Sequence, residues 1–154
     1  MFGEIDMYDL MKAALRQNPE YLLVGEIRGK EAYVLFQAMS SGHATYSTIH
    51  ADSTQSLMHR FEGEPINIPR HMLTDLDVVS LHVIKKLDKG RVRRCKRIVE
   101  IVEIDPSTNE ILVNEVFHWD QGSDQFFYSG KSYVLDRICK EKDMTHDQMT
   151  DEIK

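Results

Sequence analysis

Acidic, basic and imidazole side chains follow two short apolar runs of this sequence. Glu26 and Arg28 come directly after the run Tyr21–Val24, and His43 and His50 flank the next apolar run. A carboxylate can orient a water molecule and accept its proton, while cationic side chains neutralise charge that builds on phosphoryl oxygens. These residue types at the ends of apolar runs indicate a nucleoside triphosphate-hydrolysing core.

Glu26 is the candidate catalytic carboxylate, because it follows four apolar residues and Gly25 and should emerge at the end of a strand. The alternative is a loop carboxylate that only pairs with a nearby arginine. Arg28 and Arg16 are the candidate phosphate-facing cations, since the guanidinium fork suits phosphate oxygens. Their alternative is a surface salt bridge to a neighbouring glutamate.

His50 lies at the far end of the second apolar run, where ligands of α/β sheets gather, and we expect a functional role for it. His43 follows the expected end of a helix, so a structural role at that terminus stays open as the alternative to a functional one. Seven residues of extended chain span about 23 Å, so the two histidines do not suit one zinc ion. Thr48 is a candidate hydrogen-bond partner for phosphate or water.

The elements that position these residues alternate in type. Apolar spacing and capping residues predict a helix after Asp6 or Asp9 that stops at Asn18-Pro19. After it we expect, in order, a strand at 21–24, a helix from Gly29 to Gly42, a strand at 44–49, and a helix from Asp52 or Ser53 to Gly63. This βαβα order is that of an α/β fold with a parallel sheet.

Beyond residue 77 the pattern changes to strands joined by turns. We expect strands at 77–87, 91–105 and 111–119, linked through Asp88–Gly90 and Asp105–Asn109, which gives an antiparallel meander. Helical spacing returns at 133–139, and Thr145–Gln148 has the form of a capping box. The expected regions are therefore 1–76, 77–130 and 131–154.

Three segments together resemble the secretion-superfamily motor ATPases of type II secretion, type IV pili and the archaeal flagellum, the archaeal branch most of all. The segments are 6–19, 24–32 and 42–53, and the similarity continues as far as Trp119. The resemblance implies the C-terminal portion of a RecA-like P-loop ATPase core, followed by the meander and the C-terminal helices. Glu26 would belong to an atypical Walker B motif, and His43 and His50 to the His box.

The resemblance also implies the cofactors, ATP and Mg²⁺. Gly25 stands where a Walker B aspartate is usual, so Glu26 would hold the metal, directly or through water. The expected catalytic residues are Glu26, Arg28 and His50, and the expected nucleotide-binding residues are Arg16, Gly25, His43 and Thr48. The family assembles as hexamers in the cytoplasm, at the inner face of the membrane, against a membrane-embedded platform protein.

A P-loop is missing from the sequence. Gly130-Lys131-Ser132 matches the end of the G-x-x-x-x-G-K-[ST] pattern, but its first glycine would be Gln125, and bulky residues lie between. We therefore expect the chain to begin within an ATPase domain and to be inactive alone. The alternative is a non-catalytic adaptor of the same fold that binds a full-length ATPase at a ring interface.

Charge and composition exclude several other classes. The formal net charge of −6 argues against wholesale nucleic-acid binding. No run of about 18 apolar residues occurs, and we expect neither a membrane-spanning helix nor a signal peptide. One basic run stands out: Lys85, Lys86, Lys89, Arg91, Arg93, Arg94, Lys96 and Arg97. A solvated hairpin face is one explanation for it, and contact with an acidic partner, lipid head groups or a neighbouring subunit is the other.

Overall fold

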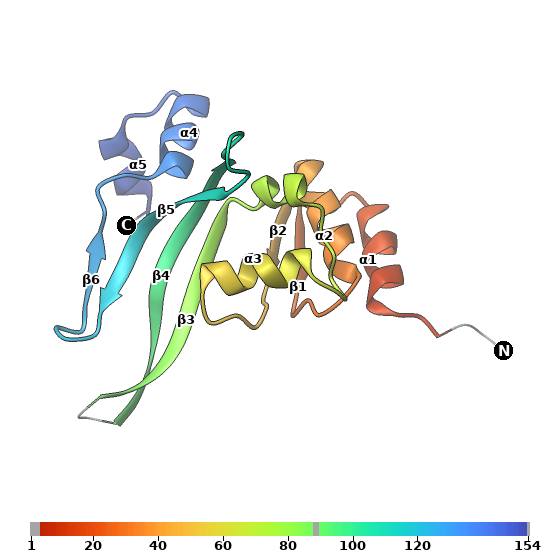
Figure 1. Ribbon diagram of the computed structural model, residues 1–154. Coiled ribbons are helices and arrows are strands. Elements are labelled where there is room, and N and C mark those ends of the chain that lie inside the picture. The colour runs from red at the N-terminus through yellow and green to blue at the C-terminus, as the bar shows by residue number, and fades with distance from the viewer. Residues whose placement is uncertain (1–3, 88–89, 154) are drawn as a thin grey trace. The chain divides into compact units, whose positions relative to one another are not determined.

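The computed structural model of the chain describes residues 4–87 and 90–153 (Figure 1). The chain divides into two compact units, Met1–Leu76 and Asp77–Lys154. The first unit contains, in order, α1 (Met7–Leu15), β1 (Tyr21–Val24), α2 (Glu31–Ser40), β2 (Ala44–Ser47), α3 (Thr54–Glu62) and the 3-10 helix η1 (Arg70–Asp75). The predicted alternation of strands and helices is confirmed, whereas η1 was not predicted.

The sheet of the first unit is a parallel pair of strands. β1 and β2 run side by side from the pair Tyr21↔Ala44 to the pair Val24↔Ser47, and α2 makes the crossover between them. Apolar side chains of α2 fill the core, where Phe36 meets Phe61 of α3 edge-on at 5.2 Å between ring centroids. Burying one such side chain stabilises the fold by about 1.5–3 kcal/mol relative to leaving it exposed.

Capping groups fix the helix ends. Asp6 caps α1 in a reciprocal box with Asp9, and Ser53 caps α3, as the sequence predicts. At the end of α2, the Gly42 amide donates to Met39 and the His43 amide to Ala38, a closure that requires the positive φ of Gly42.

Boundaries of α2 and β2 differ from the predictions. Helix α2 begins at Glu31 rather than at Gly29, because the Glu31 carboxylate accepts the amides of Arg28 and Gly29 and holds them in a turn. Strand β2 ends at Ser47 rather than at Ile49, and the next residue, Thr48, contacts the loop that follows β1.

The second unit contains an antiparallel meander in the order β3 (Val78–Leu87), β4 (Gly90–Ile104), β5 (Ile111–Asp120) and β6 (Gln125–Tyr128). The predicted meander is confirmed, with β3 and β4 forming a long curved hairpin (Figure 1). In the turn predicted between them, Asp88 and Lys89 lie outside the described residues. Strand β6 was not predicted.

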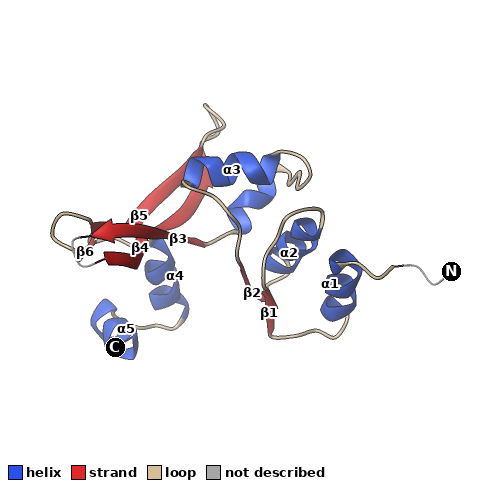
Figure 2. Ribbon diagram, turned by 90° about the horizontal axis from the view of Figure 1, so that it is seen from below, coloured by secondary structure: helices blue, strands red, loops and turns tan. Residues whose placement is uncertain are grey.

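Two helices complete the second unit: α4 (Tyr133–Glu141) and α5 (His146–Ile153). Helix α4 lies against the sheet, and α5 lies beyond α4 (Figure 2). The Thr145–Gln148 capping box is confirmed, since the side chain of each residue accepts the amide of the other. These helices belong to the same compact unit as the meander.

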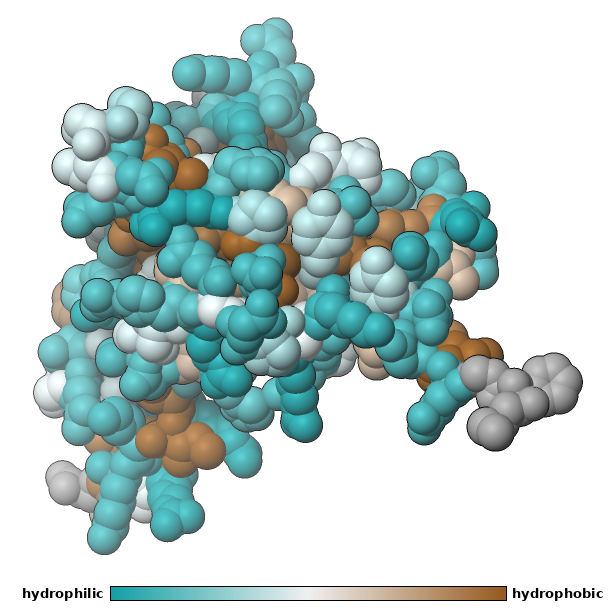
Figure 3. All heavy atoms as spheres, turned by 45° about the vertical axis from the view of Figure 1, so that its right-hand side comes forward, coloured by the Kyte–Doolittle hydropathy of each residue, from teal (hydrophilic) through white to brown (hydrophobic). Residues whose placement is uncertain are grey.

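The surface mixes polar and apolar side chains. On the face shown in Figure 3, hydrophilic atoms surround several separate apolar patches. Among the described residues, no helix combines the length and the apolar character needed to cross a membrane.

Candidate functional site

The site forms where the two parallel strands of the first unit end. The chain leaves β1 through Gly25–Arg28 and leaves β2 through Thr48–His50, and the two segments stay bonded to each other. The Ile27 amide donates to the Thr48 carbonyl at 3.0 Å, and the Thr48 hydroxyl donates to the Gly25 carbonyl at 2.6 Å. This pairing brings Glu26, Arg28 and His50 to one edge of the sheet.

The Glu26 carboxylate is the centre of this cluster. One oxygen lies 2.6 Å from a guanidinium nitrogen of Arg28, and the other lies 3.2 Å from Nε2 of His50. The side chain of Glu26 is 26% exposed and that of His50 is 83% exposed, so solvent reaches the cluster. The hydrogen bond from Arg28 holds the pKa of the Glu26 carboxyl below its ordinary value, and electrostatic interaction with His50 and Arg60 acts in the same direction. Glu26 is thus an anion at neutral pH.

A glutamate that the sequence analysis did not assign holds the turn that carries Arg28. Glu31 accepts the amides of Arg28 at 2.6 Å and Gly29 at 2.9 Å. A Cβ atom at position 29 would come within 3.2 Å of the Glu31 carboxylate, so the glycine suits this close approach. Burial raises the pKa of Glu31, but the hydrogen bonds from backbone amides together lower it by more, so that it lies below its ordinary value.

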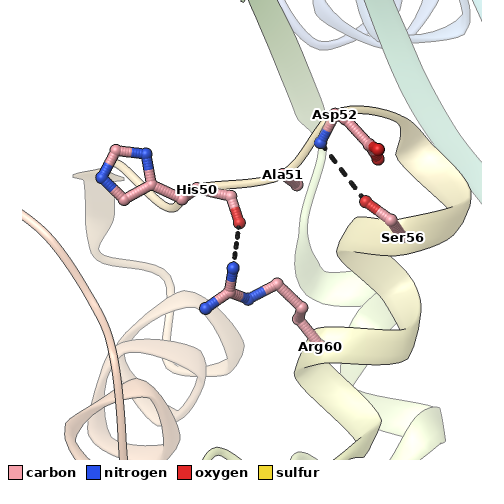
Figure 4. A pocket seen from close by; sticks show the side chains of 5 residues that line it. All are labelled: His50, Ala51, Asp52, Ser56 and Arg60. Carbon is pink, nitrogen blue, oxygen red and sulfur yellow. Dashed lines mark hydrogen bonds between the residues drawn. The ribbon is translucent and has the colours of Figure 1, made fainter.

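An arginine from helix α3 fixes the second segment of the site. Arg60 donates to the His50 carbonyl at 2.7 Å, and the Asp52 amide donates to the Ser56 hydroxyl at 3.3 Å (Figure 4). His50, Ala51, Asp52, Ser56 and Arg60 line an open hollow of about 540 Å³. The His50 ring points away from Arg60, toward solvent and the Glu26 carboxylate.

Two predicted site residues lie elsewhere. Arg16 caps the end of α1, ahead of the amino end of β1, and is exposed. His43 lies at the amino end of β2, the opposite end from His50, where its Nδ1 is 3.0 Å from the Ser41 hydroxyl. The structure therefore gathers Gly25, Glu26, Arg28, Thr48 and His50 and leaves Arg16 and His43 outside the cluster.

Sequence reasoning missed Glu31 and Arg60. The signal for Glu31 was its place in the first turn of a helix, where a carboxylate can accept free amides. The signal for Arg60 was weaker, because its approach to His50 depends on which side of α3 faces the loop.

The P-loop-like segment at the start of α4 already holds an anion. Buried Glu100 accepts bonds from the Ser132 hydroxyl and from the amides of Tyr133 at 2.8 Å and Val134 at 3.2 Å. Asn114 also donates to it, at 3.0 Å. The helix-terminal amides that would cradle a phosphate thus bind a carboxylate of the same chain.

Two members of the basic run are paired within the second unit. Arg94 makes a two-point contact with Asp124 at 2.7 Å, and Arg97 lies 3.0 Å from Glu115. Lys89 lies outside the described residues. Within the described part of the chain, no group of three or more His, Cys, Asp or Glu side chains is placed to hold a metal ion.

The sequence of the chain is similar to that of a known protein family. The model of the type II/IV secretion system protein family matches residues 2–145. An uncharacterized protein of Methanocaldococcus jannaschii is 51% identical over 138 residues, which are 89% of this chain and 51% of that protein.

Two further relatives carry functional names. The type IV pilus retractation ATPase PilT of Pseudomonas aeruginosa is 34% identical over 54% of this chain and 26% of its own length. A putative conjugal transfer protein of Mycobacterium tuberculosis is 28% identical over 78% of this chain and 35% of its own length. The chain thus spans about half of the first relative and smaller shares of the others.

Proposed function

Because the chain belongs to the type II/IV secretion system protein family, we propose that it is the C-terminal part of a hexameric ATP-hydrolysing motor that powers protein secretion or the assembly of a pilus or archaeal flagellum. The observation that carries the proposal is the Glu26 carboxylate, held between Arg28 and His50 at the carboxyl ends of two parallel strands. Ligands of α/β sheets bind at that edge. The βαβα order supports a RecA-like core.

The chemistry assigned to this chain is the orientation of water and the stabilisation of charge. Glu26 is an anion that can accept a hydrogen bond from an attacking water. Arg28 and His50 lie beside it, where they can turn to developing charge on a γ-phosphate. Thr48 and Gly25 fix the backbone beneath them.

ATP and Mg²⁺ are the proposed cofactors. Bound magnesium would neutralise charge on the phosphates, and Glu26 is the carboxylate of the cluster able to hold it through water, with other ligands from water and nucleotide. One oxygen of Glu26 contacts Arg28 and the other lies beside His50, which fits a water-mediated contact better than a direct one. Arg16 and His43, outside the cluster, would touch nucleotide only across a boundary between subunits.

The proposed partners are further copies in a ring and a membrane-embedded platform protein, with the motor in the cytoplasm at the inner face of the membrane. A P-loop must then come from outside these 154 residues, since the sequence holds none and the α4 terminus binds Glu100. Nucleic acid is not a proposed partner, because the chain is acidic.

A chimera tests this function. The matched half of the Methanocaldococcus jannaschii relative is replaced by this chain, and magnesium-dependent ATP hydrolysis is measured. We expect turnover that Glu26→Gln lowers by about 10²–10⁴-fold while nucleotide still binds, because an amide keeps the shape but is not a base. Lys131→Ala, in the P-loop-like segment, is the matched control and should leave turnover unchanged.

One result would contradict the role of Glu26, and another would contradict the motor. Turnover unaffected by Glu26→Gln would move catalysis to another carboxylate. A folded chimera without hydrolysis, together with binding of the isolated chain to the intact relative, would favour the adaptor instead.

A further inference from the structure

Strand β6 leaves an aromatic edge of the second unit open. It is the last strand of the sheet, and it consists of Gln125, Phe126, Phe127 and Tyr128. The three aromatic residues are 56%, 46% and 50% exposed. Natural edge strands usually carry lysine, proline or a bulge that discourages pairing with another chain. None of these occurs in β6, so the strand is suited to receive another strand.

The hydrogen-bond alternation of the β5–β6 pair shows which groups face outward. The Ser129 amide donates to the Val116 carbonyl at 2.9 Å, which fixes the phase of the ladder. Phe127 then belongs to a bonded pair with His118, whereas Phe126 and Tyr128 belong to non-bonded pairs. The amides and carbonyls of Phe126 and Tyr128 therefore point to the open edge.

We propose that β6 pairs antiparallel with β6 of a second copy of this chain, centred on Phe127. In this register Phe126 of one copy faces Tyr128 of the other, and their outward groups supply the main-chain hydrogen bonds. Phe127 faces its own counterpart, and neutral Gln125 faces neutral Ser129. Aromatic cross-strand pairs of this kind stabilise a sheet.

The charges at the two ends of the strand favour the same occupant. Asp120 is the last residue of β5, and Asp124, which Arg94 already pairs, lies in the turn before β6. Lys131 follows the strand. Antiparallel pairing of two copies brings the acidic turn of each copy to the lysine end of the other. The strand is thus complementary to itself in hydrogen bonding and in the charges at its two ends, as a twofold contact requires.

The contact should be weak, because it joins two four-residue strands. Interfaces below about 1,200 Å² are typical of transient pairs. We expect a dissociation constant between about 1 μM and 1 mM. The pairing uses no residue of the Glu26 cluster, so its failure would leave the proposed motor function untouched.

Analytical ultracentrifugation of the full 154-residue chain over this concentration range tests the proposal. The apparent mass should rise from 17.9 kDa toward twice that value. Phe127→Lys and Phe127→Glu should each raise the dissociation constant about tenfold or more, since like charges then face each other across the twofold. An equimolar mixture of the two variants should regain the dimer. Ile84→Lys, on the opposite edge strand β3, is the matched control and should dimerise like the unchanged chain.

Three outcomes would overturn the proposal. The first is an unchanged chain that stays monomeric up to about 1 mM. The second is a Phe127→Lys variant that associates as well as the unchanged chain. The third is a mixture that stays monomeric although circular dichroism shows both variants to be folded.

Discussion

At the residue scale, the state of the Glu26 carboxylate depends mainly on its neighbour Arg28. Arg28 lowers the pKa of Glu26 through a 2.6 Å hydrogen bond. The folded chain therefore holds Glu26 ionised more readily than the unfolded chain does. The resulting stability is present above the ordinary pKa of a glutamate and is lost as the pH falls through the lowered value.

Arg28→Ala should raise the pKa of Glu26 toward that of an ordinary glutamate, because the largest cause of its lowering is gone. The midpoint is measured from carbon-13 carboxyl shifts against pH. Arg16→Ala, which removes a guanidinium outside the cluster, should leave the midpoint where it is. An unchanged midpoint in Arg28→Ala would mean that the pair does not persist in solution.

The two histidines should respond differently to truncation. His43→Ala removes the contact with the Ser41 hydroxyl at the end of α2 and should lower the free energy of unfolding by about 0.5–1.5 kcal/mol. His50→Ala removes a mostly exposed ring and should leave stability nearly unchanged, while lowering ATP turnover in the chimera. Melting temperature and hydrolysis rate separate the roles. Loss of hydrolysis in His43→Ala, with His50→Ala fully active, would reverse the assignment.

At the scale of elements, Glu100 links β4 to the start of α4 through hydrogen bonds. Glu100→Gln replaces an acceptor with a group that turns an N–H toward the donors of Ser132, Tyr133 and Val134. We expect the free energy of unfolding in urea to fall by about 1–3 kcal/mol. Glu103→Gln, exposed on the same strand, should change it by less than about 0.5 kcal/mol. Equal effects of the two changes would show that the buried bonds contribute nothing.

Much of the fold was readable from local signals. Asp6, Ser53 and Gly42 mark helix ends because their groups satisfy backbone bonds within a few residues. Strand β6 escaped notice because its side chains do not alternate between apolar and polar, and pairing with β5 defines it. Sequence thus predicts elements with local causes better than those that need a neighbour.

In the candidate site too, residues with local signals were predicted, and residues whose contacts depend on other elements were not. Glu26 and His50 were found because both follow apolar runs, and parallel strands bring such ends together. The carboxylate of Glu31 and the guanidinium of Arg60 were not, since their contacts depend on the positions of α2 and α3 around those strands. The residues that orient the candidate groups therefore had to come from the structure.

The whole molecule consists of two units of unlike construction. The second has a four-stranded sheet with a helix against it, whereas the described residues of the first form a two-stranded sheet. Two-stranded sheets are marginal without packing partners. We expect a fragment of residues 77–154 to unfold cooperatively by circular dichroism and fragment 1–76 to show a broader transition. A fragment 77–154 without any cooperative transition would contradict this division.

The meander of the second unit also has a consequence for the speed of folding. Each of its strands pairs with the next along the chain, so its contacts close short loops. In the first unit, β1 and β2 can pair only after the segment between them, which contains α2, has folded back. Closing this longer loop is slower. Although a ribosome would release the first unit earlier, we expect the later half of the chain to reach its native pairing sooner after it emerges. The earlier half would then complete its sheet after the later half is already ordered.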